Sequence, residues 1–105
     1  MPGFSTEVPH PLDRDAAVER LKSFLDKVHE RYKDQVSSLT GEWHENVLDF
    51  ELTAYTFKIS GKLTVEDKIA RLEGQLPFAA LAFKGKIQEA FSSALRKELG
   101  SAGTA

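Results

Sequence analysis

The sequence contains no cysteine, so disulfide bonds, thiolate metal sites and cysteine nucleophiles are all excluded. This absence fits a reducing compartment, although it is equally compatible with export. Positive charge is not in excess either: 14 lysine and arginine residues face 16 aspartate and glutamate residues, for a net charge of −2. Because phosphate contacts dominate nucleic-acid affinity, we expect no nucleic-acid binding from a chain with this balance.

Long hydrophobic runs are missing as well. The longest nearly apolar stretch, Leu76 to Phe83, has eight residues, whereas a helix that spans a bilayer needs about 20. Residues 1–10 show no basic segment followed by an apolar run, so we expect no signal peptide. The sequence therefore predicts no membrane span, and a cytoplasmic location is expected.

The composition is that of a folded globular protein. Of the 105 residues, 41% are hydrophobic and 29% are charged, which is too balanced for a disordered chain. This length suits one domain, and it can hold a core without metal or disulfide support. We expect a single α+β domain over residues 1–100 and a disordered C-terminal tail at residues 101–105.

A two-residue period dominates the middle of the chain and predicts strands. It first appears in a short segment around Phe4–Val8. Pro9 and Pro11 end this segment, because proline has no backbone N–H to donate to the hydrogen bonds between strands. Four further alternating segments follow between Leu39 and Leu76. Their short connections predict antiparallel hairpins, and their alternation predicts a sheet with one covered and one solvated face. We expect the first strand to lie beside the last.

Two segments with a period of about 3.6 residues flank these four strands and predict helices. The first, Asp15–Lys33, carries an apolar stripe with residues alternately three and four apart, and aspartates near its start offer an N-cap. The second begins near Phe83 and ends at Leu99, with Gly100 as a natural C′ residue. The predicted fold is β-α-β-β-β-β-α: an antiparallel sheet of about five strands with two helices packed on one face, similar to a helix-grip fold.

Three glycines lie inside predicted strands or at the start of a predicted helix, where glycine is unfavourable unless it has a structural role. Gly61 and Gly74 interrupt the apolar face of the sheet, and each marks either a bulge or a place where a helix comes close. Gly85 lies between Lys84 and Lys86 near the start of the second helix. The two lysines could contact an anion there, but we favour the interpretation that Gly85 permits close packing of the helix on a strand.

No constellation of catalytic residues is visible in the sequence. His44 and Glu45 lack the second histidine of a zinc-protease motif. Glu42, Asp49 and Glu51 share the predicted solvent face, where pairing with lysines is more common than acid–base catalysis. We therefore expect no enzyme activity, no metal site and no cofactor, and we assign no catalytic residue.

The apolar segment before the second helix is the strongest candidate for an interaction surface. Three large apolar side chains follow closely there, and a domain of this size cannot be assumed to bury all of them. The candidate surface comprises Phe78, Leu81, Phe83, Lys84 and Lys86. The alternative is that this segment simply closes one end of the core.

Six short motifs lie between His10 and Leu99, and the match that they carry covers about Phe4 to Leu99, nearly the whole chain. They are His10-Pro11-Leu12, Glu30-Arg31-Tyr32, Gly41-Glu42-Trp43, Phe57-Lys58-Ile59-Ser60-Gly61-Lys62-Leu63, Phe83-Lys84-Gly85-Lys86-Ile87 and Leu95-Arg96-Lys97-Glu98-Leu99. Together they resemble the polyhydroxyalkanoic acid system protein family of small bacterial proteins. The resemblance implies a role at or near polyhydroxyalkanoate storage granules, and it supplies no catalytic residues.

Two functions remain open from the sequence. The first is a non-enzymatic interaction module whose partner is the granule surface or a granule-associated protein. The second is a small protein that binds an acyl or lipid-like ligand in a cavity under the long helix. Candidate residues for lining that cavity are Trp43, Tyr55, Phe57 and Phe91. A homodimer, formed through an edge strand or the apolar segment, is also left open.

Overall fold

The computed structural model describes residues 3–54 and 56–100. Tyr55 and the tail at residues 101–105 lie outside the described residues, so the expectations for them stay predictions. The elements follow one another in the order β1 (Gly3–Pro9), α1 (Arg14–Leu21), α2 (Phe24–Arg31), β2 (Val36–His44), β3 (Val47–Ala54), β4 (Phe57–Glu66), β5 (Ile69–Gln75), the 3-10 helix η1 (Phe78–Phe83) and α3 (Lys84–Leu99).

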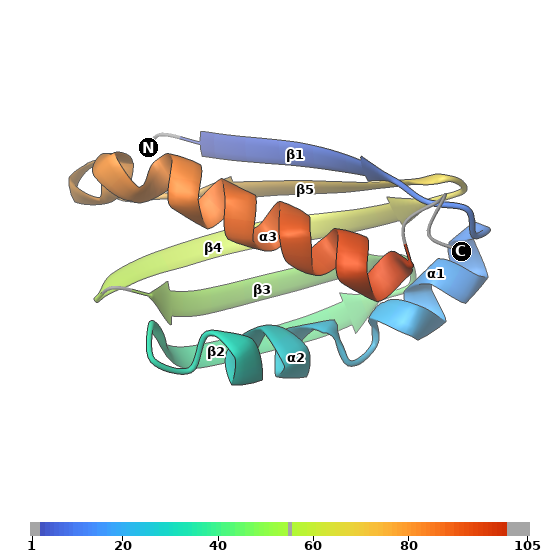
Figure 1. Cartoon of the computed structure of the whole chain (residues 1–105), viewed down its shortest axis with the longest axis horizontal. Coiled ribbons are helices and arrows are strands. Elements are labelled where there is room, and N and C mark those ends of the chain that lie inside the picture. Colours follow the sequence, from blue (N-terminus) through green and yellow to red (C-terminus); the bar gives the residue numbers. More distant parts are fainter. Residues whose placement is uncertain (1–2, 55, 101–105) are drawn as a thin grey trace.

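The five strands form one antiparallel sheet in the order β1-β5-β4-β3-β2. The strands β2 to β5 are consecutive hairpins, as their short connections predict. The first strand pairs with the last, with Phe4 opposite Gly74 and Val8 opposite Ala70. The predicted strand content and the placement of β1 are therefore confirmed, and β1 and β2 are the two edges of the sheet (Figure 1).

The helices cover one face of the sheet. Figure 1 shows α3 running along the sheet, with α1 at one end of the molecule and α2 beside β2. On the strands, side chains alternate between the two faces: Leu48, Phe50 and Leu52 are buried, whereas Asp49 and Glu51 are exposed. The predicted α+β class is confirmed, with a five-stranded antiparallel sheet and a long C-terminal helix in a helix-grip arrangement.

The first helix is interrupted. The sequence predicts one helix over Asp15–Lys33, but the structure has α1 and α2, separated by Lys22 and Ser23. Ser23 has φ −100° and ψ 10°, and the Lys22 N–H donates to the Glu19 carbonyl three residues back. The bend lets α1 contact β4 and α3 while α2 contacts β2 and α3. Periodicity missed it because the apolar stripe continues across it, through Ala17, Leu21, Phe24 and Val28.

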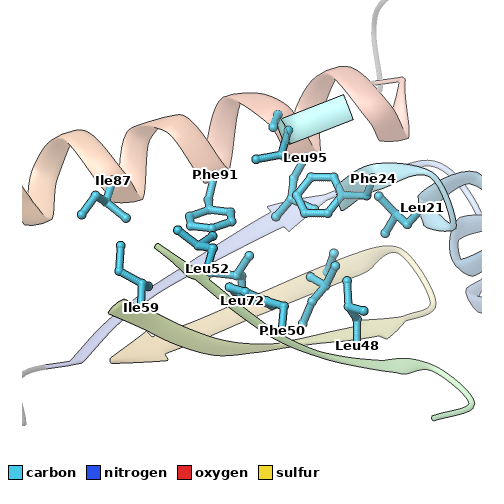
Figure 2. Packing of buried hydrophobic residues seen from close by; sticks show 14 of the residues in the cluster. Leu21, Phe24, Leu48, Phe50, Leu52, Ile59, Leu72, Ile87, Phe91 and Leu95 are labelled. Carbon is cyan, nitrogen blue, oxygen red and sulfur yellow. The ribbon is translucent and has the colours of Figure 1, made fainter. Parts of the chain in front are cut away.

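The core lies between α3 and the sheet, and aromatic rings fill its centre. Gly61 of β4 is paired with Gly74 of β5. On their other sides, Gly61 is paired with Phe50 of β3 and Gly74 with Phe4 of β1. The register is continuous through both glycines, so neither marks a bulge. The ring of Phe91 from α3 approaches both phenylalanines, at centroid distances of 6.1 Å to Phe4 and 5.3 Å to Phe50. Figure 2 shows Phe91 pointing from α3 toward the strands.

Candidate functional site

An apolar pocket of about 270 Å³ opens between α2, α3 and the strands β2 to β4. Its inner lining comes from residues whose side chains also belong to the core. Ile87 and Phe91 are 6% and 4% exposed and lie one turn apart on α3, and Ile59 of β4 is fully buried. Figure 2 shows Ile87 and Ile59 facing each other across this end of the core. The rest of the apolar lining comes from Val28, Val36, Leu52, Ala54 and Ala90.

The rim of this pocket is polar. Lys86, Tyr32 and Gln35 line it, and no aspartate or glutamate does so among the described residues. The turn that carries the rim is held by its backbone, since the Tyr32 carbonyl accepts from the N–H groups of Gln35 and Val36, each at 2.8 Å. None of the three rim side chains makes a hydrogen bond or ion pair with another described residue. Their donors are therefore available to a ligand.

The size of the pocket restricts what it can hold. Pockets for drug-sized ligands usually measure about 300 to 1,000 Å³, and this one falls just below that range at about 270 Å³. Since a water molecule occupies about 30 Å³ in the liquid, the volume corresponds to roughly nine water-sized groups. The pocket has room for a short apolar chain.

The apolar segment η1 lies at the start of α3 and is largely exposed. Phe78 is 73% exposed and Leu81 is 46% exposed, although both are large apolar side chains. Leu76 and Ala80 are fully buried and fix the segment to the body of the protein. Phe83 is half-buried against Phe57 of β4, with ring centroids 5.8 Å apart. The segment therefore contributes to the end of the core and also leaves an apolar surface outside it.

Positive charge accompanies this surface. Lys84 and Lys86 lie in the first turn of α3, which has no acidic residue and no side-chain cap. Cations are unfavourable at the positive end of a helix dipole, so the two lysines do not serve helix stability there. The expectation that Gly85 allows close packing is wrong, because a side chain at Gly85 would meet nothing within 4 Å.

The structure gathers most of the predicted site residues at one end of the molecule. Phe91 and Lys86 line the pocket, and the ring of Phe57 contacts that of Phe83 at the end of η1. Trp43 is elsewhere: it is half-buried on β2, in a separate hollow beside Leu25. Tyr55 lies outside the described residues. Sequence reasoning missed Tyr32 and Gln35, because no local motif marks a rim formed by segments far apart in the chain.

The described residues of the sheet's solvated face carry charged side chains around an open hollow. The hollow measures about 1030 Å³ and is lined in part by Asp49, Glu51 and Lys62. Glu51 lies 3.9 Å from Lys58, whereas Asp49 lies 3.8 Å from His44. Asp49 and Glu51 are exposed, and each lies near one basic side chain, an arrangement that does not exclude water from a reacting centre. Within residues 3–54 and 56–100, no group of three or more His, Asp or Glu side chains could hold a metal ion.

A family model for polyhydroxyalkanoic acid system proteins matches residues 5–99 of the chain. The chain belongs to this family. The resemblance carried by the short sequence motifs is thereby confirmed. Membership names no reaction for this polyhydroxyalkanoic acid system protein. No match is found among the curated proteins.

Two solved structures are similar to this polyhydroxyalkanoic acid system protein. The protein TTHA0849 from Thermus thermophilus is 15% identical, with a TM-score of 0.57, and the match covers 93% of this chain and 94% of that chain. A protein from Nitrosospira multiformis is 9% identical, with a TM-score of 0.52 and coverage of 93% and 96%. At these identities the likeness shows the fold alone. In the part of the chain that is described, no helix is long and apolar enough to cross a membrane.

Proposed function

We propose that this protein is a non-enzymatic binding module of the polyhydroxyalkanoate storage system that acts in the cytoplasm. It attaches to the apolar surface of the stored polymer through the η1 surface, which we define as Phe78 and Leu81 with the flanking Lys84 and Lys86. The observation that carries the proposal is the 73% exposure of Phe78 next to a second exposed apolar residue, Leu81. Membership of the polyhydroxyalkanoic acid system family supports the choice of the polymer as the partner.

The energetics favour an apolar partner. Covering the exposed part of Phe78 removes on the order of 150 Å² from water, which corresponds to about 3–4 kcal/mol before the entropy of attachment is subtracted. Leu81 adds a smaller contribution, since about half of it is already covered. The two lysines favour a polymer surface that carries bound anionic groups, because no acidic residue lies between Leu76 and Gln88.

A co-sedimentation assay with polyhydroxyalkanoate particles tests this attachment. The variant Phe78→Asp with Leu81→Asp is expected to remain folded and to lose most of its binding. Arg14→Glu is the matched control, since it changes the net charge by the same −2 at an exposed position on α1, at the other end of the molecule (Figure 1). Unchanged sedimentation of a folded double variant would refute the proposal.

A second copy of the chain is the competing partner for the η1 surface. Light scattering coupled to size-exclusion chromatography distinguishes the two cases. A monomer that binds particles supports the proposal. A dimer that the double variant converts to monomers, together with no binding to particles, assigns the surface to self-association instead.

The pocket under α3 favours a second function, the binding of a small hydrophobic ligand. The supporting observation is the apolar lining of a pocket of about 270 Å³ whose rim donors have no described partner. Native mass spectrometry of protein purified under mild conditions would test this function, with a bound acyl compound as the expected result. This function and attachment to the polymer use different residues except for Lys86, so one can fail without the other.

A further inference from the structure

We infer that the pocket between α2 and α3 binds a medium-chain carboxylic acid, with the carboxylate at Lys86 and the chain against Ile87 and Phe91. The inference rests on the second proposed function, ligand binding, and it names the chemical class of that ligand. Attachment of the η1 surface to the polymer is not required for it.

The arrangement of α3 gives the pocket an apolar inner part and a charged outer part. Ile87 and Phe91 form the buried row of the helix, whereas Lys86 and Ala90 form the adjacent row, exposed and half-buried. All four residues line the pocket. A ligand that follows the surface of α3 inward therefore passes from a cation at the rim to apolar side chains inside.

The charge of the rim selects an anion. Lys86 is the only charged residue among the described residues that line the pocket. Tyr32 and Gln35 add a hydroxyl and an amide, both of which can donate to a carboxylate oxygen. A cationic ligand would be repelled by Lys86, and no carboxylate among the described lining residues would offset this repulsion. An uncharged ligand would make no charge–charge contact with the ammonium group of Lys86.

The size of the pocket selects the chain length. A volume of roughly nine water-sized groups holds a chain of about six to eight carbons when the carboxylate remains at the rim. Small side chains create this space, since Ala54 and Ala90 stand where larger residues would fill it.

Titration calorimetry with octanoate, octanol and octylamine tests the inference on the full-length protein. We expect octanoate to bind more tightly than octanol, and octylamine to bind most weakly. Lys86→Gln should weaken octanoate binding by about three- to tenfold and leave octanol binding unchanged, because it removes one charge-assisted contact at an exposed rim. Lys97→Gln is the matched control, since Lys97 is another exposed lysine on α3 and does not line the pocket.

A second variant and a second measurement locate the site. Ala90 is half-buried and lines the pocket, so the larger side chain of Ala90→Phe should fill the space. This variant should bind neither octanoate nor octanol. In the wild-type protein, octanoate should shift the backbone amide signals of Tyr32, Ile59 and Ile87 and leave those of Asn46 unchanged.

Each contrary result overturns a different part of the inference. Equal affinity for octanoate and octanol, with no effect of Lys86→Gln, would refute the carboxylic acid and leave hydrophobic binding intact. Amide shifts confined to other parts of the molecule would refute the site. No binding of any of the three compounds to wild-type protein would refute ligand binding altogether.

Discussion

Gly61 of β4 and Gly74 of β5 are paired directly across the sheet, and neither position has room for a side chain. The ring of Phe50 occupies the space above Gly61, and the ring of Phe4 occupies the space above Gly74. Phe91 of α3 packs on both rings. The two glycines thus let three aromatic rings lie between the helix and the sheet.

We predict that Gly61→Ala destabilises the protein by about 1–3 kcal/mol, the usual cost of overpacking a core. The new methyl group would lie 2.7 Å from the Glu73 backbone carbonyl and would also meet the Phe50 ring. Gly85→Ala is the control: with open space around it, it should stabilise α3 by about 0.5–1 kcal/mol. Urea unfolding measures both changes, and a neutral Gly61→Ala would contradict the packing described above.

Two phenylalanines of the same helical region should differ sharply in their contribution to stability. Phe91→Ala is expected to cost about 3–5 kcal/mol because Phe91 is 4% exposed and contacts two other rings. Phe78→Ala should change the free energy of unfolding by less than about 0.5 kcal/mol, since Phe78 is exposed. A loss above about 1 kcal/mol for Phe78→Ala would mean that this residue is part of the core and not of a binding surface.

His10 joins the start of the helical region to the β4–β5 turn. Its Nδ1 accepts from the Leu12 N–H at 3.1 Å, so its Nε2 carries the proton that it donates to the Glu66 carbonyl at 2.9 Å. His10→Ala should cost about 1–3 kcal/mol, because two hydrogen bonds are lost at a buried position. Nitrogen NMR should find the neutral tautomer protonated at Nε2, and the opposite tautomer would contradict this arrangement.

Arg71 connects β5 to its neighbours through two carboxylates. Its Nε donates to Glu7 Oε2 at 2.8 Å, and its Nη1 donates to Glu66 Oε2 at 3.2 Å. The hydrogen bond to Glu7 and then the charge of Glu66 raise the pKa of Arg71 above its ordinary value. Because the pKa of Arg71 is raised in the folded state, Arg71 adds to the free energy of unfolding at every pH below its pKa in the unfolded chain. This contribution is lost only as the pH rises through the pKa that Arg71 has in the folded protein.

For an arginine that loss occurs far above neutral pH, so the effect of Arg71→Gln on the thermal midpoint should stay constant between about pH 6 and pH 9. The effect should become smaller with added salt, because the three side chains are accessible to solvent. Thermal unfolding at several pH values and salt concentrations measures it. A difference that does not respond to salt would show that Arg71 stabilises the sheet through packing.

The strands were predictable from the sequence, whereas the shape of the first helical region was not. Alternation around Phe50 and Leu52 reports which face of a strand is covered, because side chains of a strand point to opposite faces. The bend at Lys22 and Ser23 leaves the helical stripe intact, so no local pattern reveals it. Gly85 shows the same limit, since its surroundings depend on how α3 approaches the sheet.

The candidate site was predictable in part. Clustered apolar residues before α3 pointed to Phe78 and Leu81 as a surface, and the structure leaves both of them exposed. The placement of Trp43 in a hollow beside Leu25, away from the pocket that Phe91 lines, could not be read from residue type. Residue type identifies aromatic side chains as core-forming, but it does not show which hollow or pocket of the folded chain each one lines.

The sequence by itself determined the antiparallel meander, its covered face and its family, because strand periodicity and turn chemistry act between residues that are close in the chain. Only the tertiary structure decided that a pocket exists between α2 and α3, that Lys86 lines it and that Phe78 stays outside the core. The pocket and its lining depend on the volume left between Val28, Ile59 and Ile87, which meet only when the chain has folded. The exposure of Phe78 depends on how η1 packs at the start of α3.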